Sequence, residues 1–170
     1  MTTPVLVVFA VGLGIAGACD LKSRRLPNPV VLALLVAGLV MRASSAGPAA
    51  LGAGVAGTLI GAALLSLPFA LHWIGGGDVK LLAAAGMWLG PARTLEAALV
   101  GLALGGFLAL LIALKHQTLR REVATNLLLA ASGAAIRPER RARAQTVPLG
   151  AALAAGALAV ALFERGLPYA

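Results

Sequence analysis

The chain has 170 residues, of which 60 % are hydrophobic and 12 % charged, and its formal net charge is +8. A soluble domain usually carries about a quarter charged residues, so the composition excludes an ordinary soluble globule and indicates a polytopic membrane protein. We interpret the excess of Lys and Arg as a signal of topology. Nucleic-acid binding is excluded because the sequence offers no basic, aromatic-bearing soluble surface. Cys19 is the single cysteine, which excludes an internal disulfide and a cysteine-based zinc site.

Six apolar stretches follow one another along the chain, and we expect each to form a transmembrane helix. They lie at about 3–19, 29–43, 49–73, 79–90, 94–114 and 147–163. No Lys or Arg precedes the first stretch, so we expect a retained span and not a cleaved signal peptide. The second reaches full length if Arg42 extends to the head groups. The fourth is too short alone, so it has to begin in a wet cavity or in a locally thin bilayer. The sequence therefore predicts an all-α fold, a membrane helix bundle of about six transmembrane helices in one domain, residues 1–170.

The basic residues predict the orientation of this bundle. We place the loops at about 20–28, 74–78 and 115–146 on one side of the membrane. The other side then keeps Arg42, Arg93 and Arg165 of the 14 basic residues, which leaves 11 on the first side. The positive-inside rule makes the first side cytoplasmic. The 115–146 loop combines helical apolar spacing with a basic strip. This pattern indicates a positively charged cytoplasmic loop or a platform for an anionic membrane.

Two acidic residues lie at span boundaries on the predicted cytoplasmic side. Asp20 ends the first span and Asp78 opens the fourth. An acid at membrane depth is costly and indicates a functional site. Two neighbouring carboxyl groups share a proton, so one activates water as a base while the other protonates the scissile carbonyl as an acid. The pair titrates as a unit, so neither role is assigned to one Asp. Charge and position alone leave open a structural role, in which the two acids pair with Arg24, Arg25 or Lys80.

The residues before the second acid favour the catalytic interpretation. Three glycines come directly before Asp78, namely Gly75, Gly76 and Gly77. Glycine permits unusual backbone dihedrals and lets an extended substrate approach closely. A protease in the membrane has to hold its substrate extended, because peptide bonds in helices are hard to cut. A plain turn is the alternative, but a turn does not explain an Asp at the last position.

The motifs resemble a known family. Gly75-Gly76-Gly77-Asp78 is similar to the GxGD signature of membrane aspartyl proteases, and Lys80 follows it as in prepilin peptidases. Asp20 followed by Arg25-Leu26-Pro27-Asn28 resembles the first catalytic block of that family. Val147-Pro148-Leu149-Gly150 is similar to its entry into the last span, although members often have Tyr in place of Leu149. The resemblance spans nearly the whole chain and is weakest in the 115–146 loop.

The resemblance to prepilin peptidases, the type IV prepilin leader peptidases, implies an activity and a substrate. The catalytic residues would be Asp20 and Asp78, with Arg25, Pro27, Asn28, Lys80 and the three glycines as motif or substrate-binding residues. The substrate would be a prepilin or pilin-like precursor, whose basic leader is cut at the cytoplasmic face of the inner membrane. Anionic lipids, or acidic residues of the substrate, are the expected partners of the basic loops.

The resemblance also implies what this chain lacks. Larger family members carry a domain with paired CxxC motifs and methylate the new N-terminus. With Cys19 alone, we expect no such domain, no metal, no cofactor and no methyltransferase activity. A short form like those that serve tight-adherence (Flp-type) pili fits best, and an archaeal preflagellin peptidase has a similar minimal plan.

Other functions need other residues. A zinc protease requires His-Glu-x-x-His, which is absent, and a rhomboid-type enzyme requires a His at the depth of Ser66, whereas His72 and His116 fall near span ends. Trp73 and Trp88 suit anchoring at the membrane interface.

Two alternatives use the same acids. A small membrane transporter or assembly subunit would use Asp20 and Asp78 as a proton relay at the middle of the membrane, whereas both fall at its cytoplasmic edge. A presenilin-like protease would cut deeper in the membrane, and the Leu-Pro-Asn block after Asp20 argues against it.

Overall fold

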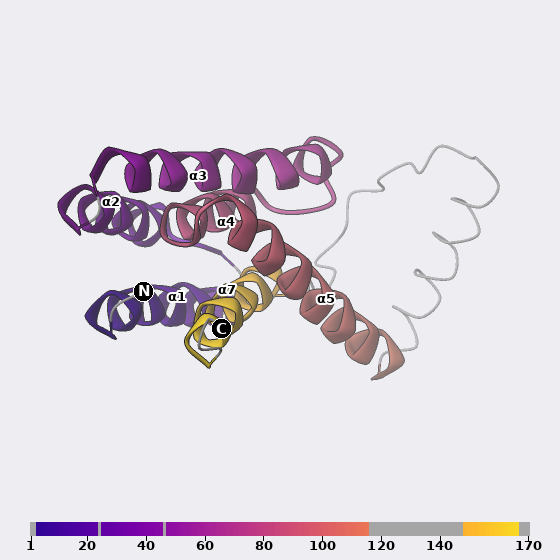
Figure 1. The fold of residues 1–170 in the computed structure, drawn as a ribbon. Helices are drawn as coiled ribbons and strands as arrows, with labels where there is room; N and C mark the ends of the chain where they lie inside the picture. The colour runs from indigo at the N-terminus through magenta and orange to yellow at the C-terminus, as the bar shows by residue number, and fades with distance from the viewer. Residues whose placement is uncertain (1–2, 24, 46, 116–147, 167–170) are drawn as a thin grey trace. The chain divides into compact units, whose positions relative to one another are not determined.

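A computed structural model describes residues 3–23, 25–45, 47–115 and 148–166 of the chain. These residues form six helices and no strand (Figure 1). The helices are α1 (Thr3–Ser23), α2 (Asn28–Ser45), α3 (Gly47–Ala70), α4 (Gly76–Leu89), α5 (Pro91–Lys115) and α7 (Leu149–Gly166). Each coincides with one of the six apolar stretches, which confirms the predicted all-α fold. The 115–146 loop lies almost entirely outside the described residues.

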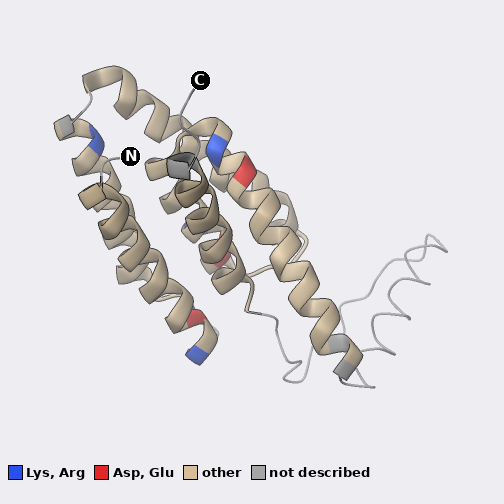
Figure 2. Ribbon diagram, turned by 60° about the horizontal axis from the view of Figure 1, so that its bottom comes forward, with Lys and Arg blue, Asp and Glu red and all other residues tan. Residues whose placement is uncertain are grey.

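Three of these helices are long and apolar enough to cross a membrane. They are α1, α3 and the part of α5 from Pro91 to Ile112, while Asn28–Ser44 and Leu149–Phe163 form shorter apolar helices. Charged residues gather near the helix ends, and the stretches between them are apolar (Figure 2). Length, composition and charge placement together make this a membrane helix bundle.

The chain divides into two compact units. One comprises residues 1–104 and 148–170, and the other residues 105–147. The described part of the second unit is the C-terminal end of α5. The candidate site lies wholly within the first unit.

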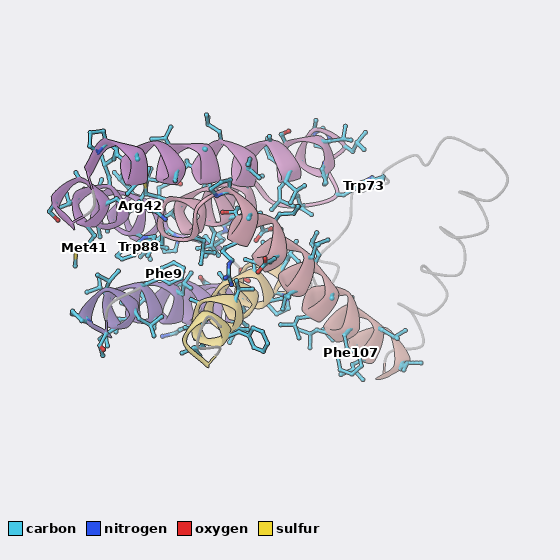
Figure 3. The ribbon with its side chains drawn as sticks, viewed as in Figure 1. Phe9, Met41, Arg42, Trp73, Trp88 and Phe107 are labelled. Atoms are coloured by element: carbon cyan, nitrogen blue, oxygen red, sulfur yellow. The ribbon has the colours of Figure 1, made fainter. Side chains whose placement is uncertain are left out.

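Helix α4 is the centre of the first unit. It packs against α2, α3 and α7, and α1 packs against α2 and α7. Eight of the 14 residues of α4 are buried. The ring of Trp88 on α4 stacks on the ring of Phe9 on α1, with the ring centroids 5.2 Å apart (Figure 3). The indole Nε1 of Trp88 donates a hydrogen bond to the carbonyl oxygen of Leu34 on α2 over 2.8 Å. The predicted interface anchor at Trp88 is therefore wrong, because this side chain is only 3 % exposed and ties three helices together.

Glycines set the distance between α3 and α4. A Cβ on Gly57 would collide with the carbonyl oxygen of Gly86, and a Cβ on Gly61 would lie 2.7 Å from that of Leu82. Gly57 and Gly61, four residues apart on α3, thus allow the two backbones to touch. Between α5 and α7, Gly101 meets Gly156 in the same way.

The loop between α3 and α4 begins with a tight turn at the C-terminus of α3. The amide of Trp73 donates to Pro68 O and that of His72 to Phe69 O, both over 2.9 Å, which is the Schellman pattern. His72 has a φ of 60°, the left-handed conformation that this motif requires. The chain then runs through Trp73, which is 68 % exposed, to Gly75, the N-cap residue of α4.

Candidate active site

Asp20 lies in the last turns of α1, inside the helix and not in the loop after it. It is 6 % exposed, and its Oδ2 accepts a hydrogen bond from the backbone N–H of Ala151 over 2.9 Å. Ala151 is in the first turn of α7, where backbone N–H groups have no partner within the helix. The Asp20 side chain supplies an acceptor to one of these N–H groups. Asp20 therefore caps a helix that begins 129 positions after it in the chain.

Asp78 lies in the first turn of α4. Gly75 is the N-cap residue, with extended backbone (φ −80°, ψ 148°). The amide of Asp78 donates to Gly75 O over 3.1 Å, and the amide of Gly75 donates to Oδ2 of Asp78 over 3.2 Å. This reciprocal pair is a capping arrangement, which is a structural reason for an acid three positions after Gly75. The spacing of glycine and Asp alone is therefore weaker evidence for catalysis than it is in the sequence.

The fold brings Asp20 and Asp78 close enough for their charges to interact. Asp78 precedes residues 79–90, which we expect to cross the membrane. Burial raises the pKa of Asp78 from 3.8 to about 6, and the negative charge of Asp20 adds to this rise. The hydrogen bond from Gly75 lowers the same pKa, but by less. A carboxyl group with this pKa holds or releases a proton close to neutral pH, as a general acid or base requires.

Leu26 packs between the start of α4, which carries Asp78, and the start of α7, which Asp20 caps. A Cβ on Gly77 would lie 3.1 Å from Leu26 Cβ, and a Cβ on Gly150 would lie 2.9 Å from Leu26 Cδ1. The leucine of the Arg25-Leu26-Pro27-Asn28 block thus fills the space that glycine leaves on both α4 and α7. This contact explains Gly77 and Gly150 by close approach. Gly76 is similarly crowded, since a Cβ there would lie 3.1 Å from Phe69 Cε2.

The remaining motif residues form hydrogen bonds at and just before the start of α2. Pro27 O accepts from the amides of Val30 and Val31 over 3.1 and 3.3 Å, which starts the helix. Lys80 Nζ donates to Asn28 Oδ1 over 3.1 Å. Arg25 is exposed, and its carbonyl oxygen accepts from Ser23 Oγ over 3.2 Å.

The structural alternative paired the acids with basic side chains. Within the described ranges, neither Asp20 nor Asp78 forms an ion pair, and the ion pair found there joins Arg93 to Glu96. Arg24 lies outside the described residues. Ser66, the candidate of a rhomboid-type site, is exposed and donates to Ala63 O of its own helix. Over the same described residues, no three His, Cys, Asp or Glu side chains lie close enough together to hold a metal ion.

One part of this site has only a weak signal in the sequence. The partner of Asp20 is a backbone N–H, which any residue but proline supplies. The resemblance of Pro148-Leu149-Gly150 to the entry of a last span is the one hint that this turn belongs to the site.

Fold and site together define a membrane helix bundle in which two carboxyl groups interact electrostatically, near the end of α1 and the starts of α4 and α7. A model of the type IV leader peptidase family matches residues 7–114. The match covers more than half of the chain and both acids, and the protein belongs to this family. No match was found among curated proteins or among solved structures. As a member of a peptidase family, the protein is a leader peptidase-like protease.

Proposed function

We propose that this protein is an aspartyl endopeptidase that removes the basic leader of a prepilin or pilin-like precursor, with Asp20 and Asp78 as the catalytic pair. The observation that carries this proposal is the electrostatic interaction between the two carboxyl groups, and both acids fall within the residues that the family model matches. The whole chain, residues 1–170, would act as a single peptidase domain.

The proposed mechanism follows from the sharing of one proton. The ionised carboxyl group accepts a proton from water as that water attacks the scissile carbonyl carbon. The protonated carboxyl group donates to the carbonyl oxygen, and a tetrahedral intermediate forms without a covalent bond to the enzyme. The first carboxyl group then donates its new proton to the amide nitrogen, while the second takes a proton from a hydroxyl group of the intermediate. The C–N bond breaks, and the pair returns to its starting state.

The surroundings of the pair support cleavage at the membrane surface. Asp20 lies within one turn of the end of α1, and Asp78 within one turn of the start of α4. A proton relay through the membrane would need acids near mid-helix, so these positions favour a peptidase over a transporter. Lys22 and Arg25 are exposed next to Asp20, and we propose that they face the anionic head groups of the inner membrane at its cytoplasmic side.

Cleavage of a co-expressed prepilin by the wild type, Asp20→Asn and Asp78→Asn tests the proposal. Asn keeps the size of the side chain and an oxygen that accepts from Ala151 or Gly75, so each variant should still insert and fold. It cannot exchange a proton, so each single change should abolish processing. Processing near the wild-type rate by either inserted variant would refute the aspartyl mechanism.

A further inference from the structure

The first turn of α7 lies outside the 7–114 match, yet it contacts the proposed catalytic pair. Its amide at Ala151 donates to Oδ2 of Asp20 over 2.9 Å. This is the hydrogen bond that the described structure gives to the Asp20 carboxyl group, and the carboxyl group is nearly fully buried. A buried carboxyl group with a fixed partner has few orientations open to it.

Gly150 makes this contact possible. A Cβ at this position would lie 3.0 Å from both Cγ and Oδ2 of Asp20 and 2.9 Å from Leu26 Cδ1. Leu26 has little freedom to move away, because it also lies against Gly77 at the start of α4. Gly150 is helical, so the reason for glycine here is space and not backbone conformation. Any larger residue would displace the carboxyl group of Asp20 or separate α7 from α1.

We propose that Gly150 and the backbone N–H of Ala151 position Asp20 for catalysis, so that the first turn of α7 is the third element of the active site. The inference rests on the catalytic pair proposed above. The hydrogen bond holds Oδ2, which leaves Oδ1 as the oxygen of Asp20 that is available for proton exchange in the reaction. Gly150 and Ala151 are positioning residues, because they act through Asp20 and contact no substrate atom.

A chain with only two aspartates makes the test direct. Labelling of aspartate with ¹³C at the side-chain carboxyl gives two signals, one from Asp20 and one from Asp78. Each is assigned by its loss in the corresponding Asn variant. We expect Gly150→Ala to shift the Asp20 signal and to lower kcat by roughly 100-fold, the typical effect of a small displacement of a reacting group. KM should change little, because substrate contacts remain.

Gly156→Ala is the matched control on the same helix. Its Cβ would lie 2.7 Å from Gly101 Cα and 2.8 Å from Ala97 O, so it is crowded as strongly, but by α5 and not by Asp20. This variant should lose stability and keep the Asp20 signal of the wild type. If Gly150→Ala does not fold, Ala151→Pro replaces it. That variant deletes the donor in the first turn, where proline removes no bond within the helix.

The outcomes separate this inference from the proposed function. A shifted Asp20 signal with low kcat in Gly150→Ala or Ala151→Pro supports it. Wild-type kcat and an unshifted signal in these variants, next to inactive Asn variants, would overturn the positioning role alone. An equal shift in Gly156→Ala would also overturn it, because the effect would then be general packing. Active Asn variants would overturn the catalytic pair and this inference together.

Discussion

Lys80 Nζ donates a hydrogen bond to Oδ1 of Asn28 over 3.1 Å, across 52 positions of sequence. The bond joins the start of α2 to the start of α4, and so links the two segments that carry the family-like motifs. Both side chains are exposed. Within the described structure, Lys80 therefore braces two helix starts and does not serve as a counter-ion for either aspartate.

Loss of this brace should weaken the protein only slightly. Lys80→Met keeps the apolar stem and removes the donor, and Asn28→Ala removes the acceptor. An exposed hydrogen bond of this kind contributes about 0.5–1.5 kcal/mol, so each change should lower the free energy of unfolding by about 1 kcal/mol or less. A double-mutant cycle on unfolding in detergent micelles should give a coupling of the same size. Strictly additive effects would show that the bond contributes nothing. Loss of cleavage without loss of stability in Lys80→Met would assign Lys80 a direct role in the reaction.

Asp78→Asn should stabilise the protein in a pH-dependent way while it removes activity. The folded state raises the pKa of Asp78 from 3.8 to about 6, so ionisation of this carboxyl group opposes folding. The penalty is fully present above pH 6, declines as the pH falls through 6, and is absent below 3.8. Asn carries no charge and so avoids this ionisation penalty. The melting temperature of Asp78→Asn should therefore exceed that of the wild type most above pH 6, and the difference should vanish near pH 3.8.

Glu96→Gln is the control for this pH dependence. The Glu96 carboxylate lies 3.7 Å from Arg93 Nη1 and its side chain is 53 % exposed, so its loss should not stabilise the protein at any pH. If Asp78→Asn proved less stable than the wild type at every pH, the capping role of Asp78 at α4 would outweigh the penalty of burial.

The contact between α3 and α4 should tolerate no side chain at Gly57. A Cβ there would collide with Gly86 O and would lie 2.9 Å from the backbone of Gly90, and backbone atoms cannot move aside. Gly57→Ala should therefore lower the free energy of unfolding by about 2–3 kcal/mol, the upper range for overpacking. Gly52→Ala on the same helix is the matched control, because nothing lies within 4 Å of its Cβ. Equal stability of the two variants would mean that α3 and α4 are not in backbone contact.

The helices could be predicted from sequence because each apolar stretch is a strong signal, but their ends could not. α1 continues past Asp20 to Ser23, since Leu21, Lys22 and Ser23 are compatible with a helix that leaves the apolar region. α4 begins at Gly76, before the apolar residues, because Asp78 and Gly75 cap it. Hydropathy reports where a chain prefers lipid, and hydrogen bonds at the caps decide where the helix ends.

Counting spans placed Asp20 and Asp78 on one side of the membrane, because the end of the first span and the start of the fourth lie on the same side. The hydrogen bond from α7 to Asp20 could not be predicted, because its donor is a backbone N–H, which nearly every residue type supplies. Trp88 was wrongly assigned to the membrane interface because the sequence does not reveal which groups a side chain contacts. An indole near a span end has the same composition whether it faces head groups or, as here, stacks on Phe9 and donates to Leu34 O.

Arg42 should be essential for the stability of the short central helix. Its Nη1 donates to Ala50 O over 2.8 Å and its Nη2 to Trp88 O over 2.7 Å, so it turns into the bundle and not to the head groups as we expected from sequence (Figure 3). With 14 residues, α4 is about 21 Å long, which is short for a hydrocarbon core of about 30 Å. Its last carbonyl groups would lack water, and the guanidinium supplies a donor to one of them.

Arg42→Leu should accordingly lower the free energy of unfolding by about 2–3 kcal/mol, the range for losing a hydrogen bond to a charged group in a partly buried site. Arg42→Lys should fall between Leu and the wild type, because an ammonium group reaches one carbonyl but lacks the planar fork that spans two. Reversible unfolding in mixed micelles measures both. If Arg42→Leu were as stable as the wild type, water would have to reach Trp88 O, and the end of α4 would then lie at the membrane surface and not within the hydrocarbon.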